Sequence, residues 1–320
     1  MNEFELIKNY FQKLSKNTPG SLNLNDDVFF DKNKKLVVSV DTYIEGNHFI
    51  NFKKPDLVIK KVIRSSISDL ICKGVFPKYY FISASGNNKS FTKSNLLKII
   101  RSLSQEQKKY KIYLSGGDTV LSKKLSFTIT SIGFANNIIS RNKTKLNDDI
   151  YVTGNIGDSY LGLLILKNKI KLQKRLKEYF IKQYYKPDIQ HSLVKHLKKF
   201  ANSSIDLSDG LLSDLEKLTN KQKYSYKISL NKIPISKNLS SVLNLKKLLK
   251  KNFISRGDDY QILFTASSNK RNLIKKISTF EGLKITRIGK IVNYRQKSSI
   301  IDRNGSKIKL NFKGHFHNFS

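Results

Sequence analysis

The sequence is notable first for what it lacks: it contains no tryptophan, one cysteine, one methionine and five prolines in 320 residues. The single cysteine, Cys72, excludes an internal disulfide and a zinc site built from several cysteines. No stretch approaches the length of about eighteen apolar residues that a membrane span needs. The N-terminal residues are acidic and lack the apolar segment of a secretory signal. We therefore expect a cytoplasmic protein with no membrane association.

Acidic residues are also scarce, because 24 Asp and Glu stand against 60 Lys and Arg, a formal net charge of +36. Such a charge is typical of nucleic-acid-binding proteins. The lysines are spread along the chain, however, and the abundance of Lys, Asn and Ile is what AT-rich codons produce. No zinc-finger spacing, aromatic RNA-binding motif or basic heptad array occurs. We favour compositional drift and expect no specific nucleic-acid partner, with a basic nucleic-acid-binding protein kept as an alternative.

Hydrophobic patterning predicts that strands and helices alternate along the chain. The expected strands are 35–40, 79–86, 111–115, 124–135 and 150–153, with one more within 252–267, and a strand, turn and helix are expected within 203–218. The expected helices are 56–74, 94–110, the end of 150–166, the lysine-rich stretches 167–182 and 240–251, and an N-terminal amphipathic helix with Phe4, Leu6, Ile7, Phe11 and Leu14. We predict an α/β (α+β) protein with an N-terminal mixed sheet. A polar stretch at 135–149 suggests two domains, 1–138 and 139–320.

The few aspartates gather at the ends of predicted elements or in turns. They are Asp26, Asp27, Asp41, Asp69, Asp118, Asp206, Asp209, Asp258 and Asp259. Each alone is explained by a helix cap, a turn or a solvated loop. Their repeated placement beside apolar runs favours a shared site, since ligands of α/β sheets bind at the carboxyl ends of strands. Carboxylates without cysteine, and with few histidines, favour a hard cation such as Mg²⁺.

Other motifs limit the chemistry. A glycine turn, GNIGDS at 154–159, precedes a predicted helix and is a weak candidate for anion binding. The chain has neither a P-loop nor the catalytic-loop motif of protein kinases. No Ser-His-Asp or Cys-His combination for nucleophilic catalysis is recognisable.

Seven segments, taken together and in order, resemble the thiamine-monophosphate kinase family. This family belongs to a larger group with aminoimidazole ribonucleotide synthetase and selenophosphate synthetase. The segments are NDDVFF (25–30), SVDTYIEGNHF (39–49), SSISDLICKGVFP (65–77), LSGGDTV (114–120), YVTGNIGDSYLGL (151–163), IDLSDGLLSDL (205–215) and GDDYQILFT (257–265). A single G-G-D would be weak evidence, whereas the ordered set covers nearly the whole chain.

The resemblance implies an enzyme that phosphorylates thiamine monophosphate with ATP, giving thiamine diphosphate, with several Mg²⁺ ions. It also implies a homodimer built through the N-terminal sheet, and a second α/β domain that closes the ATP cleft. The implied metal ligands are Asp27, Ser39, Asp41, Asp69, Asp118, Asp206 and Asp209. The implied ATP contacts are Gly117, Asp118, Arg141 and Ser208, and the implied substrate contacts are His48, Asp258 and Phe312. Because the acceptor is already an anionic phosphate, we expect direct in-line transfer without a dedicated catalytic base.

The chain departs from the family pattern at a few positions. Asn23 and Asn25 stand where glycines are usual, Val40 replaces a threonine, and Asp258 replaces a glutamate. Phe312 stands where an aromatic residue, often tryptophan, is expected. A related ATP-dependent synthetase acting on another small substrate is the second alternative. A selenophosphate-type activity is disfavoured because Cys72 lies within a predicted helix.

Overall fold

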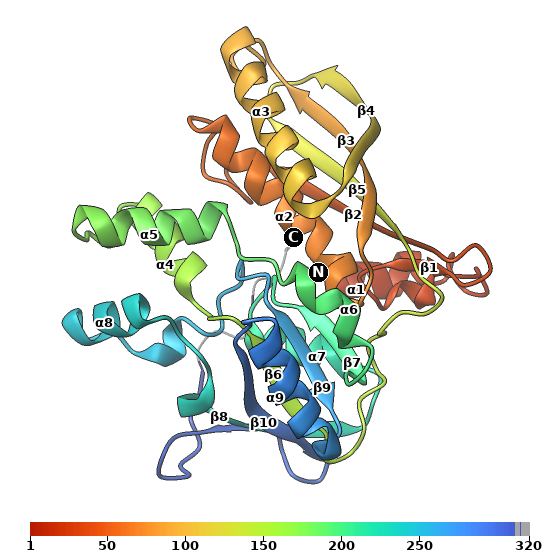
Figure 1. The fold of residues 1–320 in the computed structure, drawn as a ribbon, viewed down its shortest axis with the longest axis vertical. Coiled ribbons are helices and arrows are strands. Elements are labelled where there is room, and N and C mark those ends of the chain that lie inside the picture. The colour runs from red at the N-terminus through yellow and green to blue at the C-terminus, as the bar shows by residue number, and fades with distance from the viewer. Residues whose placement is uncertain (311–313, 315–320) are drawn as a thin grey trace.

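The computed structural model describes residues 1–310 and 314 of the chain, and within them it has two β-sheets. The first sheet has the order β1-β2-β5-β3-β4. Its strands are β1 (Phe29–Asp31), β2 (Leu36–Ile44), β3 (Pro77–Gly86), β4 (Tyr113–Leu121) and β5 (Ser126–Phe134). Only β3 and β4 pair in parallel. Two helices, α2 (Pro55–Cys72) and α3 (Lys93–Tyr110), lie along one side of this sheet (Figure 1).

The second sheet has the order β11-β8-β10-β6-β9-β7. Its strands are β6 (Asp149–Thr153), β7 (Ser203–Asp206), β8 (Tyr224–Ser229), β9 (Ile262–Ala266), β10 (Ile285–Asn293) and β11 (Ser299–Ile301). The helices of this half are α4 (Asp158–Leu166), α5 (Lys174–Tyr185), α6 (Val194–Leu197), α7 (Leu211–Leu218), α8 (Lys237–Leu245) and α9 (Arg271–Phe280). Both sheets mix parallel and antiparallel neighbours, which confirms the predicted fold class.

Helix α2 lies between the two halves, and its sequence explains why. Ile59, Ile63 and Ile67 are fully buried, and so are the polar residues Lys61, Ser65 and Ser66 between them. A helix that is buried on nearly every side must lie between layers rather than on a surface. Ile63 belongs to a core cluster that includes Phe127 of the first sheet and Phe264 of the second. One continuous core therefore fixes the two sheets relative to each other.

Several elements differ from their predictions. The N-terminal segment is helical as α1 (Glu3–Leu6) and then π-helical to Phe11, but it buries no residue. The predicted helix 167–182 is irregular up to residue 173, and the predicted helix 240–251 is only partly helical because α8 ends at Leu245. Asn168 and Lys247 adopt left-handed φ angles of 56° and 51°, which end the preceding helices. The remaining predicted elements occur within a few residues of their expected bounds.

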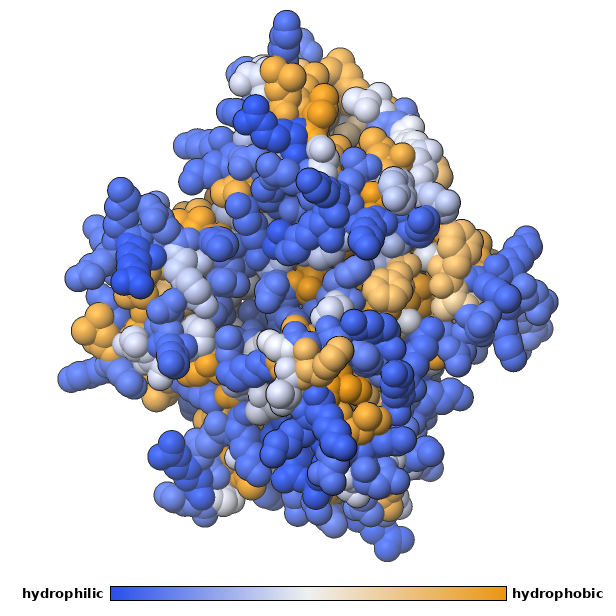
Figure 2. Space-filling model, viewed as in Figure 1, coloured by the Kyte–Doolittle hydropathy of each residue, from blue (hydrophilic) through white to orange (hydrophobic). Residues whose placement is uncertain are grey.

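The face of the first sheet that points away from α2 and α3 is uncovered. All nine residues of the edge strand β4 are exposed, and so are Val40, Phe81 and Phe134 on the neighbouring strands. Figure 2 shows hydrophobic and weakly polar side chains gathered at the upper right, where β4 lies in Figure 1, on an otherwise hydrophilic face. No helix in the described part of the chain is long and apolar enough to cross a membrane.

We predict that Phe264→Ala destabilises the protein by about 3–5 kcal/mol, because Phe264 is fully buried and stacks on Tyr151 with ring centroids 5.1 Å apart. Urea unfolding would measure the change. Phe280→Ala is the matched control, since Phe280 is 78% exposed and its truncation should cost less than about 1 kcal/mol. Equal effects of the two substitutions would contradict a continuous core through Phe264.

Candidate active site

A large cavity of about 1160 Å³ opens where the two halves meet. Residues from β2, α2, the end of β7 and the loop before β9 line it, together with α1 and the loop before β1. It collects nine of the side chains that the sequence predicts to be functional: Asp27, Asp41, His48, Asp69, Arg141, Asp206, Ser208, Asp209 and Asp258. Segments that are far apart in the sequence thus form one site.

Three of these aspartates form the centre of an acidic cluster. Carboxylate oxygens of Asp27, Asp69 and Asp206 all lie within 4.8 Å of one another. Asp27 comes from the loop before β1, Asp69 from the last turns of α2, and Asp206 from the end of β7. Carboxylates held this close repel each other unless protons or cations reduce their charge.

The pKa values of the cluster are raised accordingly. Burial raises the pKa of Asp41 to about 6, opposed by a hydrogen bond from Tyr43 Oη at 3.1 Å. Burial also raises the pKa of Asp206 to about 6, opposed by a hydrogen bond from Ser68 Oγ. The pKa of Asp69 is raised well above its usual range, first by burial and then by the charges of Asp41 and Asp206. Burial in the folded protein therefore disfavours the charged form of all three carboxyl groups.

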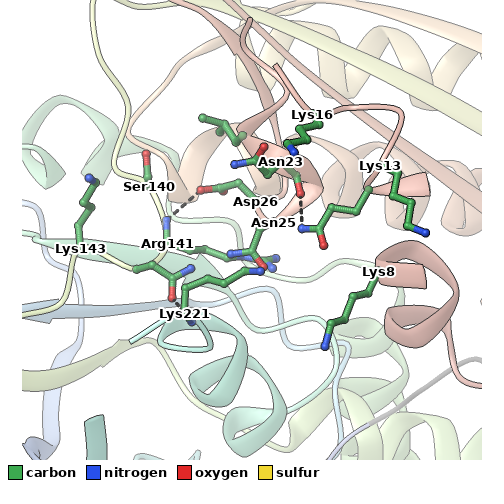
Figure 3. A pocket seen from close by; sticks show the side chains of 13 residues that line it. Lys8, Lys13, Lys16, Asn23, Asn25, Asp26, Ser140, Arg141, Lys143 and Lys221 are labelled. Atoms are coloured by element: carbon green, nitrogen blue, oxygen red, sulfur yellow. Dashed lines mark hydrogen bonds between the residues drawn. The ribbon is translucent and has the colours of Figure 1, made fainter. Parts of the chain in front are cut away.

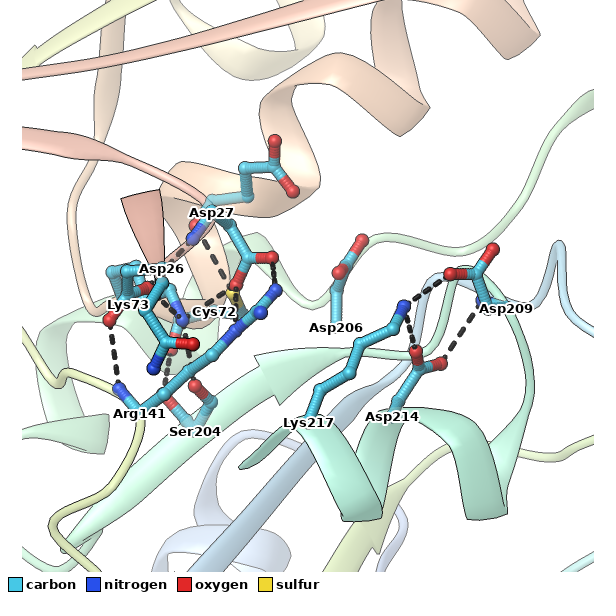
Figure 4. Close-up of polar contacts among 12 residues, drawn as sticks. Asp26, Asp27, Cys72, Lys73, Arg141, Ser204, Asp206, Asp209, Asp214 and Lys217 are labelled. Atoms are coloured by element: carbon cyan, nitrogen blue, oxygen red, sulfur yellow. Dashed lines mark hydrogen bonds and ion pairs between the residues drawn. The ribbon is translucent and has the colours of Figure 1, made fainter. Parts of the chain in front are cut away.

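Two cations bind the acidic residues before β1 (Figure 4). Lys73 is fully buried, and its Nζ lies 2.7 Å from both Asp26 Oδ1 and Asp27 Oδ2. The same amine donates to the carbonyl oxygen of Ser204 at 2.8 Å. The guanidinium of Arg141 binds Asp27, and the backbone N–H of Arg141 donates to Asp26 Oδ2 at 2.9 Å.

A third cation, Lys217, binds the acids at the start of α7 (Figure 4). Its Nζ contacts Asp209 and lies 3.0 Å from Asp214 Oδ1. Asp214 in turn accepts the backbone N–H groups of Asp209 and Gly210. The helix start is thus satisfied by Asp214, and Asp209 does not act as its N-cap residue.

Lys73, Lys217 and Asp214 are site residues that the sequence interpretation missed. The signal was local spacing: Lys73 follows Asp69 by four residues, and Lys217 follows Asp214 by three, both distances that place side chains on one helix face. In a chain with 60 basic residues this spacing does not stand out.

The donor set fits a hard divalent cation. Seven carboxylates, those of Asp26, Asp27, Asp41, Asp69, Asp206, Asp209 and Asp214, stand against the three cations Lys73, Arg141 and Lys217. These carboxylates outnumber the cations that form ion pairs with them, and the ligand atoms that converge in the central group are all carboxylate oxygens. Mg²⁺ prefers such oxygen ligands, so these residues match the metal that the sequence predicts.

Three predicted metal or nucleotide residues do not line this cavity. Ser39 is buried and donates to the carbonyl oxygen of Ser66 at 3.4 Å. Gly117 and Asp118 lie on the exposed edge strand β4. Asp118 pairs with Ser83, which pairs with Thr128, which pairs with Thr42 beside Asp41. Three strand spacings of about 4.8 Å each therefore separate Asp118 from β2. Phe312 lies outside the described residues.

Two loops of the second half are joined along the cavity wall. The N–H of Asp258 donates to the carbonyl oxygen of Ser208 at 2.8 Å, and the N–H of Tyr260 donates to that of Leu207 at 2.9 Å. At Gly257 a Cβ atom would lie 1.7 Å from the Ser208 carbonyl oxygen, so only glycine permits this approach. The pairing holds Ser208 and Asp258 next to each other on the cavity wall.

The glycine turn before α4 is hydrogen-bonded to the carboxyl group of another residue of the chain, Asp259. Asp259 Oδ2 accepts the backbone N–H of Gly157 at 2.8 Å. Asp259 is buried, and burial raises its pKa well above the usual range, opposed by the hydrogen bonds from the backbone of Gly157 and Ser159. Asp259 thus takes the Gly157 N–H that the turn would offer to a ligand anion, which weighs against anion binding at this turn.

A smaller, strongly basic cavity of about 640 Å³ adjoins the acidic one (Figure 3). The two share Asp26 and Arg141 among their lining residues. The lysines of its wall are Lys8, Lys13, Lys16, Lys143 and Lys221. None of the five has an ion-pair partner among residues 1–310. A positive rim beside the acidic cluster would attract anions towards the cleft.

The comparisons with known proteins agree on one family. A family described as AIR synthase related protein, N-terminal domain, matches residues 25–135. The thiamine-monophosphate kinase of Buchnera aphidicola subsp. Acyrthosiphon pisum is 34% identical over 98% of this chain and 98% of its own. The chain belongs to the thiamine-monophosphate kinase family. The relative from Escherichia coli K12 is 30% identical, again over 98% of both chains.

Solved structures of this family have the same fold. The structure of AaThiL complexed with AMPPCP and TMP covers 98% of this chain, with a TM-score of 0.85 and 25% identity, and 97% of that chain is covered. The crystal structure of thiamine monophosphate kinase from Aquifex aeolicus gives a TM-score of 0.80 at 25% identity, covering 96% of this chain and 99% of that one. A HypE–HypF complex, 14% identical with a TM-score of 0.75 over 96% of this chain and 99% of that chain, shares the fold alone.

The structure also accounts for two departures from the pattern of the thiamine-monophosphate kinase family. Asn23, where glycine is usual, has a φ of 54°, a left-handed conformation that Asn tolerates better than most residues. Asn25 exchanges two amide hydrogen bonds with Asn220, at 3.1 and 2.9 Å. Asn23 thus adopts a turn conformation that glycine also permits, and Asn25 is fixed by its pairing with Asn220.

We predict that Asp206→Asn stabilises the metal-free protein by about 1–3 kcal/mol at pH 7. An aspartate with a pKa of 3.8 when unfolded and about 6 when folded costs stability as the pH rises through that range, and asparagine removes this cost. The gain should therefore shrink at pH 5. Chemical unfolding with a chelator present would measure it.

Glu178→Gln is the control for this experiment, since Glu178 is exposed on α5 and should change stability by less than about 0.5 kcal/mol. A variant that is less stable than wild type at both pH values, or one whose gain does not depend on pH, would show that the charge of Asp206 is not strained.

Proposed function

We propose that this protein phosphorylates thiamine monophosphate with ATP, producing thiamine diphosphate and ADP. The observation that carries the proposal is the near-complete match to AaThiL complexed with AMPPCP, an ATP analogue, and TMP. The cavity supports it, because it combines a carboxylate cluster with the side chains of Arg141 and Ser208, which are polar groups suited to phosphate oxygens.

We further propose roles for the residues of the cavity. Asp27, Asp41, Asp69, Asp206 and Asp209 are metal ligands, with Tyr43 Oη orienting Asp41. Several Mg²⁺ ions held there would neutralise the charge between the donor and acceptor phosphates. Arg141 and Ser208 contact the nucleotide, while His48 and Asp258 contact thiamine monophosphate. Ser39 and Phe312 keep their predicted roles as metal and substrate residues.

The direct test incubates the purified protein with ATP, Mg²⁺ and thiamine monophosphate and separates the products. We expect thiamine diphosphate and ADP in equal amounts, and no product with unphosphorylated thiamine or with excess chelator. ATP consumption that does not depend on thiamine monophosphate would instead favour a related synthetase. Binding to DNA or RNA that weakens steeply with salt, in a protein without kinase activity, would favour the nucleic-acid alternative.

We predict that Asp69→Asn lowers turnover at least about a hundredfold while the protein stays folded. Asp69 contributes one of the three converging carboxylates, and the loss of its charge weakens the metal site. Turnover beside a thermal melt measures both properties, with Glu178→Gln as the active control. Near-normal turnover of a folded Asp69→Asn protein would remove Asp69 from the site.

We also propose that the protein is a homodimer built through the uncovered face of the first sheet. An exposed edge strand with an apolar face favours association. A second copy would also explain why Asp118 lies outside the cleft of its own chain: the partner's β4 would bring Asp118 to the site. Light scattering should give twice the chain mass of 36.8 kDa. A monomer at micromolar concentration would contradict the dimer.

Complementation tests the shared site. A dimer with one Asp69→Asn chain and one Asp118→Asn chain would contain one doubly altered site and one intact site if the partner supplies Asp118. We predict that such a hybrid, isolated through two different tags, has about half the wild-type activity. Both parent homodimers should be inactive. An inactive hybrid would mean that Asp118 acts within its own chain, and an active Asp118→Asn homodimer would mean that Asp118 is not needed at all.

Two further predictions are kept as proposals. We propose domains at 1–138 and 139–320, because every strand of the first sheet ends by Phe134 and the second sheet begins at Asp149. We propose a cytoplasmic location, in keeping with a cysteine, Cys72, that is free and buried.

A further inference from the structure

Lys61 is buried behind the cavity wall and has two unusual neighbours. Only 1% of its surface is exposed, and its Nζ lies 2.8 Å from Asp258 Oδ1. The same Nζ lies 3.8 Å from the centre of the Tyr184 ring, which is a cation–π contact. Lys61 belongs to α2, whereas Tyr184 and Asp258 come from the second half of the chain. The contact thus crosses the junction between the two halves.

This arrangement is costly for the fold. Burial lowers the pKa of Lys61, opposed by the charge of Asp258. Within residues 1–310 and 314 the ammonium makes no well-directed hydrogen bond, and its contact with Asp258 Oδ1 at 2.8 Å is chiefly one of charge. A buried ammonium with unused donors is unfavourable for stability, and an apolar side chain of similar length would be tolerated there. Lys61 therefore needs an explanation other than stability.

Only one of the two carboxylate oxygens of Asp258, Oδ1, is contacted by other side chains among the described residues. Oδ1 receives both the Lys61 ammonium and the Tyr260 hydroxyl, the latter at 3.2 Å. Oδ2 has no hydrogen-bond partner among the described residues, and the side chain, 29% exposed, lines the cavity. Asp258 also adopts a left-handed φ of 70°, a strained conformation that needs support from its surroundings. Its second oxygen is thereby left available to a ligand in the cavity.

Tyr184 connects this support to a second cavity residue. Its hydroxyl donates to the carbonyl oxygen of His48 at 3.1 Å, while its ring faces the Lys61 ammonium. His48 follows β2, so the two residues expected to contact the acceptor are tied to each other through Tyr184 and Lys61.

The spacing along α2 places this support relative to the metal ligands. Lys61, Ser65 and Asp69 follow one another at intervals of four residues, which puts them on one side of the helix. Eight residues of α-helix span about 12 Å, so Lys61 stands that far along α2 from the ligand Asp69. One rigid helix therefore sets the distance between the acidic cluster and Asp258.

We propose that Lys61 is a positioning residue for the phosphate acceptor: through its charge contact it holds Asp258 by Oδ1, so that Oδ2 binds thiamine monophosphate. Tyr184 fixes the Lys61 ammonium relative to the loop of His48, because its ring contacts the ammonium and its hydroxyl donates to the His48 carbonyl oxygen. This inference rests on the proposed function and adds a determinant of acceptor binding that does not itself line the cavity.

The first test compares Lys61→Met with Lys60→Met. Lys60 is the adjacent residue on the same helix, and its amine contacts Gln105 rather than the cavity. We expect Lys61→Met to raise KM for thiamine monophosphate about tenfold or more, with KM for ATP within about twofold of wild type. Its melting temperature should equal or exceed that of wild type. Lys60→Met should leave both KM values unchanged.

A double-mutant cycle separates positioning from a structural role. If Lys61 acts through Asp258, then Lys61→Met should raise KM no further in an Asp258→Asn background. Additive effects, an unchanged or lowered KM in Lys61→Met, or equal weakening of both substrates would overturn the inference. If any of these results occurred while the wild-type and Lys60→Met proteins were active, only the inference about Lys61 would fail. An inactive wild-type protein would instead contradict the proposed function.

Discussion

The mutual repulsion of the clustered aspartates is the constraint on which the rest of the site depends. Asp27, Asp69 and Asp206 come from three separate segments, and only the packing of both sheets on α2 brings them together. The charge of Lys73, Arg141 and Lys217 reduces the repulsion but does not balance it. A phosphoryl-transfer site needs this imbalance, because ligands that already have full counter-charges would bind a metal weakly. Under the proposed metal role, the fold gives up stability to keep this cluster available to cations.

The many lysines of the chain differ in where they lie relative to this acidic cluster. Most lysines are solvated and consistent with an AT-rich genome, but a few are buried beside the acidic cavity and pair with its carboxylates. Lys73 and Lys61, both on or next to α2, are fully buried and bind carboxylates at different parts of the same cavity. Surface lysines around the smaller cavity add a positive rim. Burial and partner, rather than the number of lysines, decide which ones contribute to function.

Much of the fold and of the site could be predicted from the sequence. The strand that contains Asp41 and the helix that contains Asp69 were predicted because both carry dense apolar runs, and α2 is buried on nearly every side. The segments β8 and β10 and the helix α9 were not predicted, although Ile274 and Ile277 of α9 are spaced three residues apart and are both buried. Nor could local sequence reveal Lys61, whose partners lie more than a hundred residues away. Asp118 was predicted to be a metal ligand. The sequence did not show that two strands, β5 and β3, separate it from β2, because that separation depends on the order of strands in the sheet.

The most direct test of the account counts the Mg²⁺ ions that bind to the protein with AMPPCP, by equilibrium dialysis at neutral pH. The account predicts more than one ion per chain in the wild-type protein. It also predicts fewer ions in Asp69→Asn, because that change removes one of the converging carboxylates. A wild-type protein that binds nucleotide but no Mg²⁺ beyond that carried by the nucleotide, or an ion count that Asp69→Asn leaves unchanged, would contradict the claim that the aspartate cluster is a metal site.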